Sequence, residues 1–326
     1  MKLRKGTVAF FAAAMMMILI LDGQTALEGA REGVDLCIRT IVPSLFPFFF
    51  LSSVFMDAIA GARLSALCYL GKLFSIPKGL EGLLVCGFLG GYPVGARCIG
   101  RLHKNSQISK TEAQRLLRYC SNAGPAFLFG MVGCMFPKKW MAWMLWLIHI
   151  TAAWIVSLTE LPTPAASVRG FSAELPTESP MNSAVSSILR VCGWVIMFRV
   201  MLTFLQRWII WILPLEMQII VSGLLDLING ILVLNRTGNI PLRFVLCSGM
   251  LAWGGLCVIM QTSSVVEGLS LSDYIQGKVF QTILSLLLAA GFIYRIWPVF
   301  PCIAVVTMAL RGINQKNSSF LSVADV

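Results

Sequence analysis

Long apolar runs dominate this chain, and short charged stretches separate them. Most runs are about 15–22 residues long and have no polar face, so they are too continuous for amphipathic helices packed in water. Their length is close to the roughly 20 residues that span the hydrocarbon core of a bilayer. The pattern predicts an all-α fold, a polytopic transmembrane helical bundle.

The first half carries helix-breaking residues inside its runs. Its expected membrane segments are 7–21, 41–60, 64–76, 83–100, 121–136 and 140–158. The first of these is expected to remain as an uncleaved helix, and an interfacial helix is expected between it and the second. Pro43 and Pro47 predict a kink or a break in the second segment.

The second half repeats this alternation with fewer prolines. Its expected segments are 184–205, 208–213, 218–234, 242–260, 279–290 and 296–310. The predicted organisation is an N-terminal membrane helix (1–24), a first repeat (25–158), a polar linker (159–182), a second repeat (183–311) and a polar tail (312–326).

Lys and Arg are concentrated between residues 97 and 118, which predicts that this connector faces the cytoplasm. Ser109-Lys-Thr-Glu112 has the spacing of a capping box and predicts a short helix there. The Pro-rich linker has three glutamates and one arginine over 159–181, which favours the opposite side. These two assignments require an odd number of membrane crossings between Arg118 and Thr159, where the sequence has two apolar segments. One of the two, 121–136, is therefore expected to be re-entrant.

Two patterns recur between the halves. Gly90-Gly-Tyr-Pro-Val-Gly-Ala-Arg97 corresponds to Gly254-Gly-Leu-Cys-Val-Ile-Met-Gln261. After the first motif come Ile108-Ser109 and Gln114-Arg115, which Leu271-Ser272 with Gln276 and Lys278 match one residue out of step. Internal repeats with broken helices are typical of transporter scaffolds, whose site lies near the midplane.

Composition narrows the class of protein. Of 326 residues, 57% are hydrophobic and 13% are charged, and the net charge is +11. The basic residues lie in short connectors without interleaved aromatics, which argues against a nucleic-acid partner. The cysteines are single, with no C-x-x-C pair, and only His103 and His149 are present, so no metal site or cofactor is expected. Because no catalytic arrangement appears, we expect no enzyme.

The glycine-rich segment is the first candidate for a binding site. Gly87, Gly91 and Gly95 could form a small-residue face for helix packing. Pro93 instead favours a broken segment whose backbone groups meet a polar ligand. The candidate residues from this segment are Gly90, Gly91, Tyr92, Pro93 and Arg97.

Polar residues inside other apolar runs complete the candidate site. Asp226 is the only acid deep inside a run, so it is either a ligand-binding carboxylate or half of an ion pair with Arg199 or Arg190. The remaining candidates are Asn122, Pro125, Asn229 and Gln261. A lone His149 is more often a hydrogen-bonded packing residue than a proton relay.

In order along the chain, six motifs together resemble the YlbJ family of sporulation integral membrane proteins. They are Pro43-Ser-Leu-Phe-Pro-Phe-Phe, Gly90-Gly-Tyr-Pro-Val-Gly-Ala-Arg, Ile108-Ser-Lys-Thr-Glu-Ala-Gln-Arg-Leu-Leu, Ser121-Asn-Ala-Gly-Pro, Gly223-Leu-Leu-Asp-Leu-Ile-Asn-Gly and Leu251-Ala-Trp-Gly-Gly-Leu. The resemblance covers about residues 34–288. The family usually has Glu where this chain has Asp226.

The resemblance implies a multi-pass protein of a bacterial cell membrane that carries nucleoside-recognition "Gate" domains and takes part in sporulation. Two functions follow as hypotheses. One is a permease-like protein that binds or passes a small polar solute, with a nucleoside as one candidate. The other is a membrane scaffold that recruits partners through the basic helix over 109–120. The lipid bilayer is a partner in both, and assembly into a homo-oligomer stays open.

Overall fold

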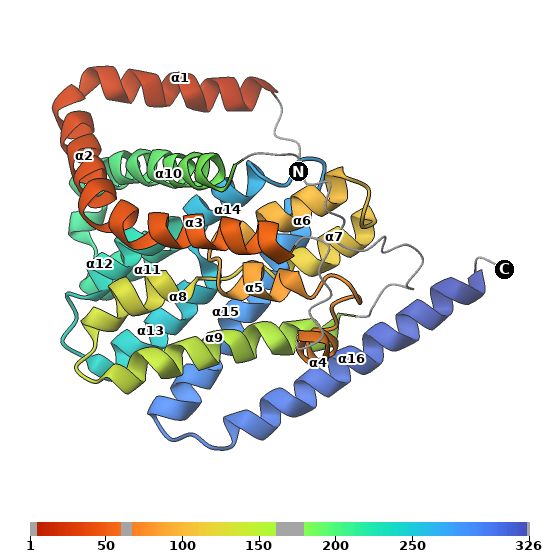
Figure 1. Ribbon diagram of the computed structural model, residues 1–326. Helices are drawn as coiled ribbons and strands as arrows, with labels where there is room; N and C mark the ends of the chain where they lie inside the picture. The colour runs from red at the N-terminus through yellow and green to blue at the C-terminus, as the bar shows by residue number, and fades with distance from the viewer. Residues whose placement is uncertain (1–4, 60–66, 161–178, 325–326) are drawn as a thin grey trace.

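The computed structural model describes residues 5–59, 67–160 and 179–324, and within these ranges every regular element is helical. Figure 1 shows a bundle of long and short helices around a common interior. The predicted all-α class is confirmed. The basic start of the chain (1–4) and most of the predicted linker (161–178) lie outside the described residues.

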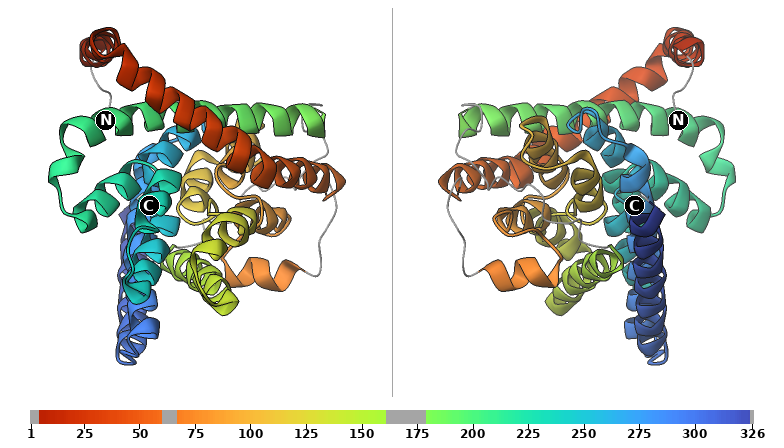
Figure 2. Two further views of the ribbon diagram at one scale, coloured as in Figure 1. Left: turned by 90° about the vertical axis from the view of Figure 1, so that its left-hand side faces the viewer. Right: turned by 90° about the vertical axis from the view of Figure 1, so that its right-hand side faces the viewer.

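The N-terminal helices enclose one side of the bundle. The elements are α1 (Lys5–Leu21), α2 (Gly23–Leu36), a π-helical stretch (Cys37–Ile41) and α3 (Val42–Ile59). Figure 2 views α1 end-on, set apart from the remaining helices. Helix α3 continues through Pro47, and the irregular stretch is instead the π-helix directly before α3.

Helix α2, predicted as an interfacial helix, packs closely against a later helix. Gly29 and Gly33 lie one turn apart on it and face Val200 and Ile196 of the later helix α10 (Pro180–Trp208). Small residues at this spacing let two helix backbones approach closely in a membrane. Helix α2 is therefore packed against the bundle on its glycine face, and its interfacial position stays a prediction.

The rest of the first half consists of short helices and one long one. They are α4 (Cys68–Leu73), α5 (Gly82–Phe88), α6 (Val94–Lys104), α7 (Lys110–Leu117), α8 (Pro125–Phe127), two further turns to Met135, and α9 (Lys139–Thr159). The chain between α5 and α6 turns at Gly91, and the chain between α7 and α8 has no regular structure over 121–124.

The second half has two helices that are interrupted. Its elements are α10, a short turn (Ile210–Ile212), α11 (Leu215–Leu225), α12 (Leu227–Leu234), α13 (Ile240–Trp253), α14 (Gly255–Ser263), α15 (Leu271–Ile293) and α16 (Val299–Ala324). Asp226 separates α11 from α12, and Gly254 separates α13 from α14. Both glycine pairs of the proposed repeat thus lie at helix breaks, while the repeat itself stays a prediction.

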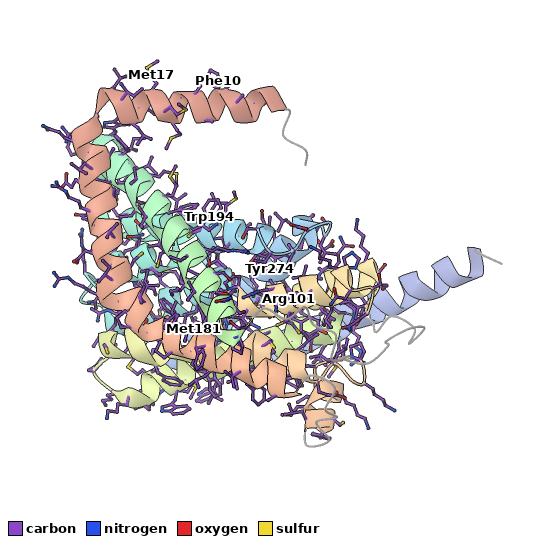
Figure 3. The ribbon with its side chains drawn as sticks, turned by 45° about the horizontal axis from the view of Figure 1, so that its top comes forward. Phe10, Met17, Arg101, Met181, Trp194 and Tyr274 are labelled. Carbon is purple, nitrogen blue, oxygen red and sulfur yellow. The ribbon has the colours of Figure 1, made fainter. Side chains whose placement is uncertain are left out.

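Five described helices are long and apolar enough to cross a bilayer. They cover Gly23–Phe55, Lys139–Thr159, Pro180–Trp208, Ile240–Ser263 and Leu271–Ile293. Large apolar side chains remain exposed on the outside, among them Phe10 and Met17, which point away from the bundle in Figure 3. An exposed apolar surface of this kind is what a lipid environment requires. The protein is a multi-pass membrane protein.

An ion pair corrects the predicted sidedness. Arg118, at the end of the basic connector, lies 2.9 Å from Glu160, which directly follows α9. At the other end of the linker, Arg97 of the connector donates to the Ser183 carbonyl at 3.2 Å. Both ends of the linker therefore lie on the connector side, and the prediction that they lie on the opposite side is wrong.

The same ion pair shows that 121–136 is a broken crossing and not a re-entrant segment. Helix α9 has 21 residues and is about 31 Å long at 1.5 Å per residue. Residues 121–124, which have no regular structure, and the helical residues 125–135 together reach at most about 30 Å. The chain thus crosses once through the broken segment and returns through α9.

Candidate functional site

A cavity lies where the helix breaks meet. Its volume is about 50 Å³, within about 540 Å³ of space between atoms that includes open solvent. Its walls come from α3, α10, α14 and three breaks; the lining residues are Leu45, Phe48, Phe49, Gly90, Gly91, Tyr92, Ala123, Gly124, Ala126, Phe127, Val191, Asp226, Leu227, Ile228, Val258 and Gln261. A mostly apolar wall with a few convergent polar groups is typical of a small-molecule site.

Five predicted site residues meet in this cavity. They are Gly90, Gly91, Tyr92, Asp226 and Gln261, from segments up to 171 residues apart in sequence. Pro93 and Arg97 line an adjoining smaller cavity, which shares Val191 and Gln261 with the first. Pro125, Asn122 and Asn229 do not line either cavity.

Close backbone contacts fix the shape of the first break. Gly91 has a φ of +77°, and a β-carbon there would lie 3.3 Å from the Gly124 nitrogen. A side chain at Gly91 would therefore strain the turn and press on the loop between α7 and α8. The break between α5 and α6 and the break between α7 and α8 are thus packed backbone against backbone at the cavity wall.

The second glycine pair packs in a comparable way. Gly255 has a φ of +85°, and a β-carbon there would lie 2.9 Å from the α-carbon of Asp226. The break between α13 and α14 therefore touches the break between α11 and α12. Each of the two glycine pairs adjoins a further helix break. Three of these four breaks line the cavity, and the break at Gly254 and Gly255 packs against Asp226 at its wall.

Tyr92 connects the two halves of the chain. Its hydroxyl lies 3.1 Å from the carbonyl oxygen of Leu251 and 3.2 Å from that of Ala252. These carbonyls belong to the last turn of α13, where the helix leaves such groups without partners inside the helix. Tyr92 thus satisfies the end of a helix in the second half while its backbone forms part of the break in the first.

Asp226 begins α12 and also lines the cavity. Its side chain is 1% exposed, and Oδ2 accepts hydrogen bonds from the backbone and side-chain nitrogens of Asn229, both at 2.8 Å. The Oδ1 of Asn229 in turn accepts from Arg199 at 2.7 Å, and Arg199 is 2.6 Å from Glu32.

The direct ion pair predicted as the alternative role of Asp226 is thus replaced by an indirect link. Asn229 stands between the carboxylate and Arg199, and Arg199 has its own acid. Among the described residues, Asp226 forms no ion pair with Arg199 or Arg190. Its carboxyl group is held by hydrogen bonds at the start of α12, where N–H groups point toward it.

Behind the cavity wall lies a polar cluster that the sequence analysis did not identify. Lys278, on α15, is completely buried, and its ammonium donates to Oε1 of Gln281 at 2.7 Å and to the carbonyl of Ser121. It also lies 3.3 Å from Oδ1 of Asn122 and from the hydroxyl of Tyr92. Asn122, predicted as a ligand-binding residue, therefore serves this cluster.

Lys278 was missed because it stands next to the apolar run over 279–290 and resembles a residue at the end of a span. Helix α15 begins at Leu271, so Lys278 is two turns inside it. The position of Gln281, one turn further on, was the available signal. A Lys and a Gln on the same helical face, inside a helix long enough to span a membrane, indicate a buried polar contact.

His149 has the structural role that was favoured for it. It is 1% exposed, and its Nε2 accepts a hydrogen bond from the backbone N–H of Ala123 at 3.2 Å. This contact holds the loop between α7 and α8 against α9. In the described part of the chain, no three His, Cys, Asp or Glu side chains come together as metal ligands.

The fold and the cavity together define a multi-pass α-helical membrane protein with an internal site at a junction of broken helices. The chain is similar to the sporulation integral membrane protein YlbJ of Bacillus subtilis (strain 168), with 25% identity over 309 residues that cover 80% of this chain and 75% of YlbJ. No family model matches the chain, and no solved structure matches it. The similarity supports the resemblance to the YlbJ family.

Proposed function

We propose that this protein is a permease-like membrane protein, not an enzyme, that binds and passes a small polar solute through the cavity between its broken helices. A nucleoside is one candidate, because the family that the chain resembles carries nucleoside-recognition "Gate" domains. The observation that supports the proposal most strongly is the convergence of three helix breaks on one cavity that is lined by Asp226 and Gln261, with a fourth break packed against Asp226. Broken helices at a cavity are how transporters present backbone groups to a solute.

The adjoining smaller cavity gives the solute a route. It is lined by Pro93 and Arg97 of the first break and by Ser187 and Arg190 of α10. Arg97 also contacts Ser187 at 2.6 Å and lies on the side of the basic connector. We propose that solute exchanges between the large cavity and that side past Gln261, which lines both spaces.

The name of the relative suggests a biological setting. YlbJ is a sporulation protein by its name, and we propose that this chain likewise acts in spore formation in a spore-forming bacterium. Passage of a solute across a membrane would be its contribution there.

The scaffold hypothesis receives less support from the contacts of the basic helix. Arg115 is 6% exposed and forms a bidentate pair with Glu112 within α7. Arg118 contacts Glu160 and Asp273. Both arginines that would have bound a partner are thus engaged inside the protein.

Thermal stabilisation of the purified protein in detergent tests the proposal. Binding to the folded state raises the apparent Tm, so we expect a dose-dependent rise with at least one member of a panel of nucleosides and nucleobases. Asp226→Asn keeps a good helix N-cap and removes the cavity charge, and it should abolish that rise. The matched control is Glu216→Gln, an exposed acid on α11, which should leave the rise unchanged.

Uptake into proteoliposomes gives the decisive result. A ligand that stabilises the protein should enter vesicles that contain the wild type and should not enter those with Asp226→Asn. A rise in Tm that survives in Asp226→Asn, or uptake that is equal in both variants, would place the solute elsewhere and overturn the proposal.

A further inference from the structure

Lys278 lies in a shell of oxygen atoms at the junction of the halves. Its ammonium contacts four of them, which are the Ser121 carbonyl, Oδ1 of Asn122, Oε1 of Gln281 and the Tyr92 hydroxyl. Three of these four come from the first half, at the break between α5 and α6 and the break between α7 and α8. The amine itself comes from α15 in the second half.

All four oxygens belong to neutral groups. In the ranges that the structure describes, no carboxylate forms an ion pair with Lys278; what lies close instead are two aromatic rings, with centroids 5.1 Å away for Tyr92 and 5.8 Å for Tyr274. Tyr274, labelled in Figure 3, is itself completely buried. Neutral oxygens and aromatic faces are the groups that hold a monovalent cation or an ammonium ion without a counter-charge.

We propose that Lys278 is a tethered coupling cation, whose ammonium fills a cation site between α15 and the two breaks of the first half. The chain would thus supply its own cation where a transporter of this kind would otherwise bind a free ion. This inference rests on the proposed permease function and adds to it that the coupling ion is a proton, carried by Lys278.

The coupling follows from the cost of a buried charge. An ammonium without a counter-ion stays charged inside a protein only while hydrogen-bond acceptors surround it. When the breaks move during solute passage, Ser121, Asn122 and Tyr92 move with them, and Lys278 then gives its proton to water. By linkage, protonation of Lys278 shifts the equilibrium between the positions of the breaks by the same free energy by which a movement of the breaks shifts the protonation of Lys278.

Other titratable groups face Lys278 from each neighbouring element. They are Tyr92, Tyr274, Cys120 at the end of α7, and His149 on α9. The phenols and the thiol are ordinarily neutral near pH 7, and His149 accepts a hydrogen bond through Nε2, as a neutral imidazole does. The lysine is therefore the group of this set whose charge changes.

Chemical rescue tests the cation site without any solute. Lys278→Ala removes three methylene groups and the ammonium, which propylammonium matches. Propylammonium chloride should raise the Tm of Lys278→Ala by roughly 3 °C at saturation and should leave the wild type unchanged. Propanol, which has the same shape without the charge, should raise the Tm of neither protein. Lys110→Ala, at an exposed lysine on α7, should respond to propylammonium as the wild type does.

An equal response of all three proteins, or no response of Lys278→Ala, would overturn the cation site. A rescue by propanol equal to that by propylammonium would do the same, because it would show that only the volume of the side chain matters. If Lys278→Ala does not fold, Lys278→Met is compared with the wild type in NaCl and in choline chloride. The Tm of the wild type should be equal in both salts. A wild-type Tm that is higher in NaCl than in choline chloride would contradict a site filled by lysine.

Proteoliposome uptake tests the coupling, with the nucleoside or nucleobase found in the thermal screen as probe. A pH gradient, and not a Na⁺ gradient, should accelerate uptake by the wild type, and Lys278→Met should bind the probe yet lose this acceleration. Acceleration by Na⁺, or an unchanged pH response in Lys278→Met, would overturn the coupling. If no probe binds or enters, the permease proposal fails, and the rescue experiment still decides the cation site.

Discussion

Tyr92 adjoins both the cavity that Asp226 lines and the buried ammonium of Lys278. Asp226 lines the cavity and is held by Asn229 at the start of α12, whereas Lys278 lies behind the hydroxyl of Tyr92. Neither charge neutralises the other, so each is stabilised by local dipoles and hydrogen bonds.

Gly255 is the residue whose replacement should best show how tightly the breaks are packed. Gly255→Ala would place a methyl group 2.9 Å from the α-carbon of Asp226 at a φ of +85°, and we expect a loss of about 2 kcal/mol in unfolding free energy. Denaturant unfolding in detergent measures it. Gly193→Ala, in α10 with no atom near the added carbon, should be neutral or stabilising, and equal effects would contradict the packing argument.

Glu160 should make stability depend on pH. Burial raises the pKa of its carboxyl above the ordinary value of 4.5, and Arg118 opposes this rise. The folded state therefore holds the proton more tightly than the unfolded chain, so this contribution to stability is present at low pH and is lost as the pH rises past 4.5. The Tm of Glu160→Gln relative to that of the wild type should increase over this window, whereas a constant difference would count against the raised pKa.

Sequence reasoning found the residues whose polarity contrasts with their surroundings. Asp226 and Gln261 interrupt apolar runs, and both line the cavity. It could not find the bridge from Asn229 to Arg199, because that contact depends on how α10 packs against α12. Lys278 lies next to a run rather than inside it, so its burial became clear only from the length of α15.

At the scale of single elements, local signals predicted helix starts better than helix continuity. Ser109 does cap α7 by accepting from the Glu112 N–H at 3.1 Å, and the expected apolar face is buried. The Glu112 carboxylate also pairs with Arg115 within the same helix. The predicted span over 218–234 is divided at Asp226, where a side-chain cap starts a new helix.

Ser109 provides a test of this local contribution. Ser109→Ala should lower the unfolding free energy by about 1 kcal/mol, because the first turn of α7 loses its side-chain acceptor. Ser109→Asp keeps an acceptor and should stay close to the wild type. Thermal unfolding of the three proteins in one detergent measures the difference; a loss of the same size in both variants would show that the hydroxyl itself, and not capping, is what matters.

At the scale of the whole molecule, sidedness follows from contacts that join distant segments. The sequence placed the connector and the linker on opposite sides because their charges differ, but charge bias is a weak signal over a short acidic stretch. The contacts of Arg118 with Glu160 and of Arg97 with Ser183 place both linker ends on the connector side. Long-range ion pairs of this kind are not visible in a single sequence.

Cysteine labelling from one side of the membrane tests this topology. In a background where the exposed Cys134 and Cys302 are replaced by Ser, single cysteines at Lys104, Ser179 and Lys138 all occupy exposed positions. The first two should react with a membrane-impermeant maleimide only after the cytoplasmic side is opened, and Lys138→Cys should react in intact cells. The reason is that Lys138 lies at the far end of α9, about 31 Å from Glu160. Labelling of Ser179→Cys in intact cells would restore the opposite-side linker, and with it the re-entrant course of 121–136 that the contact of Arg118 with Glu160 rules out.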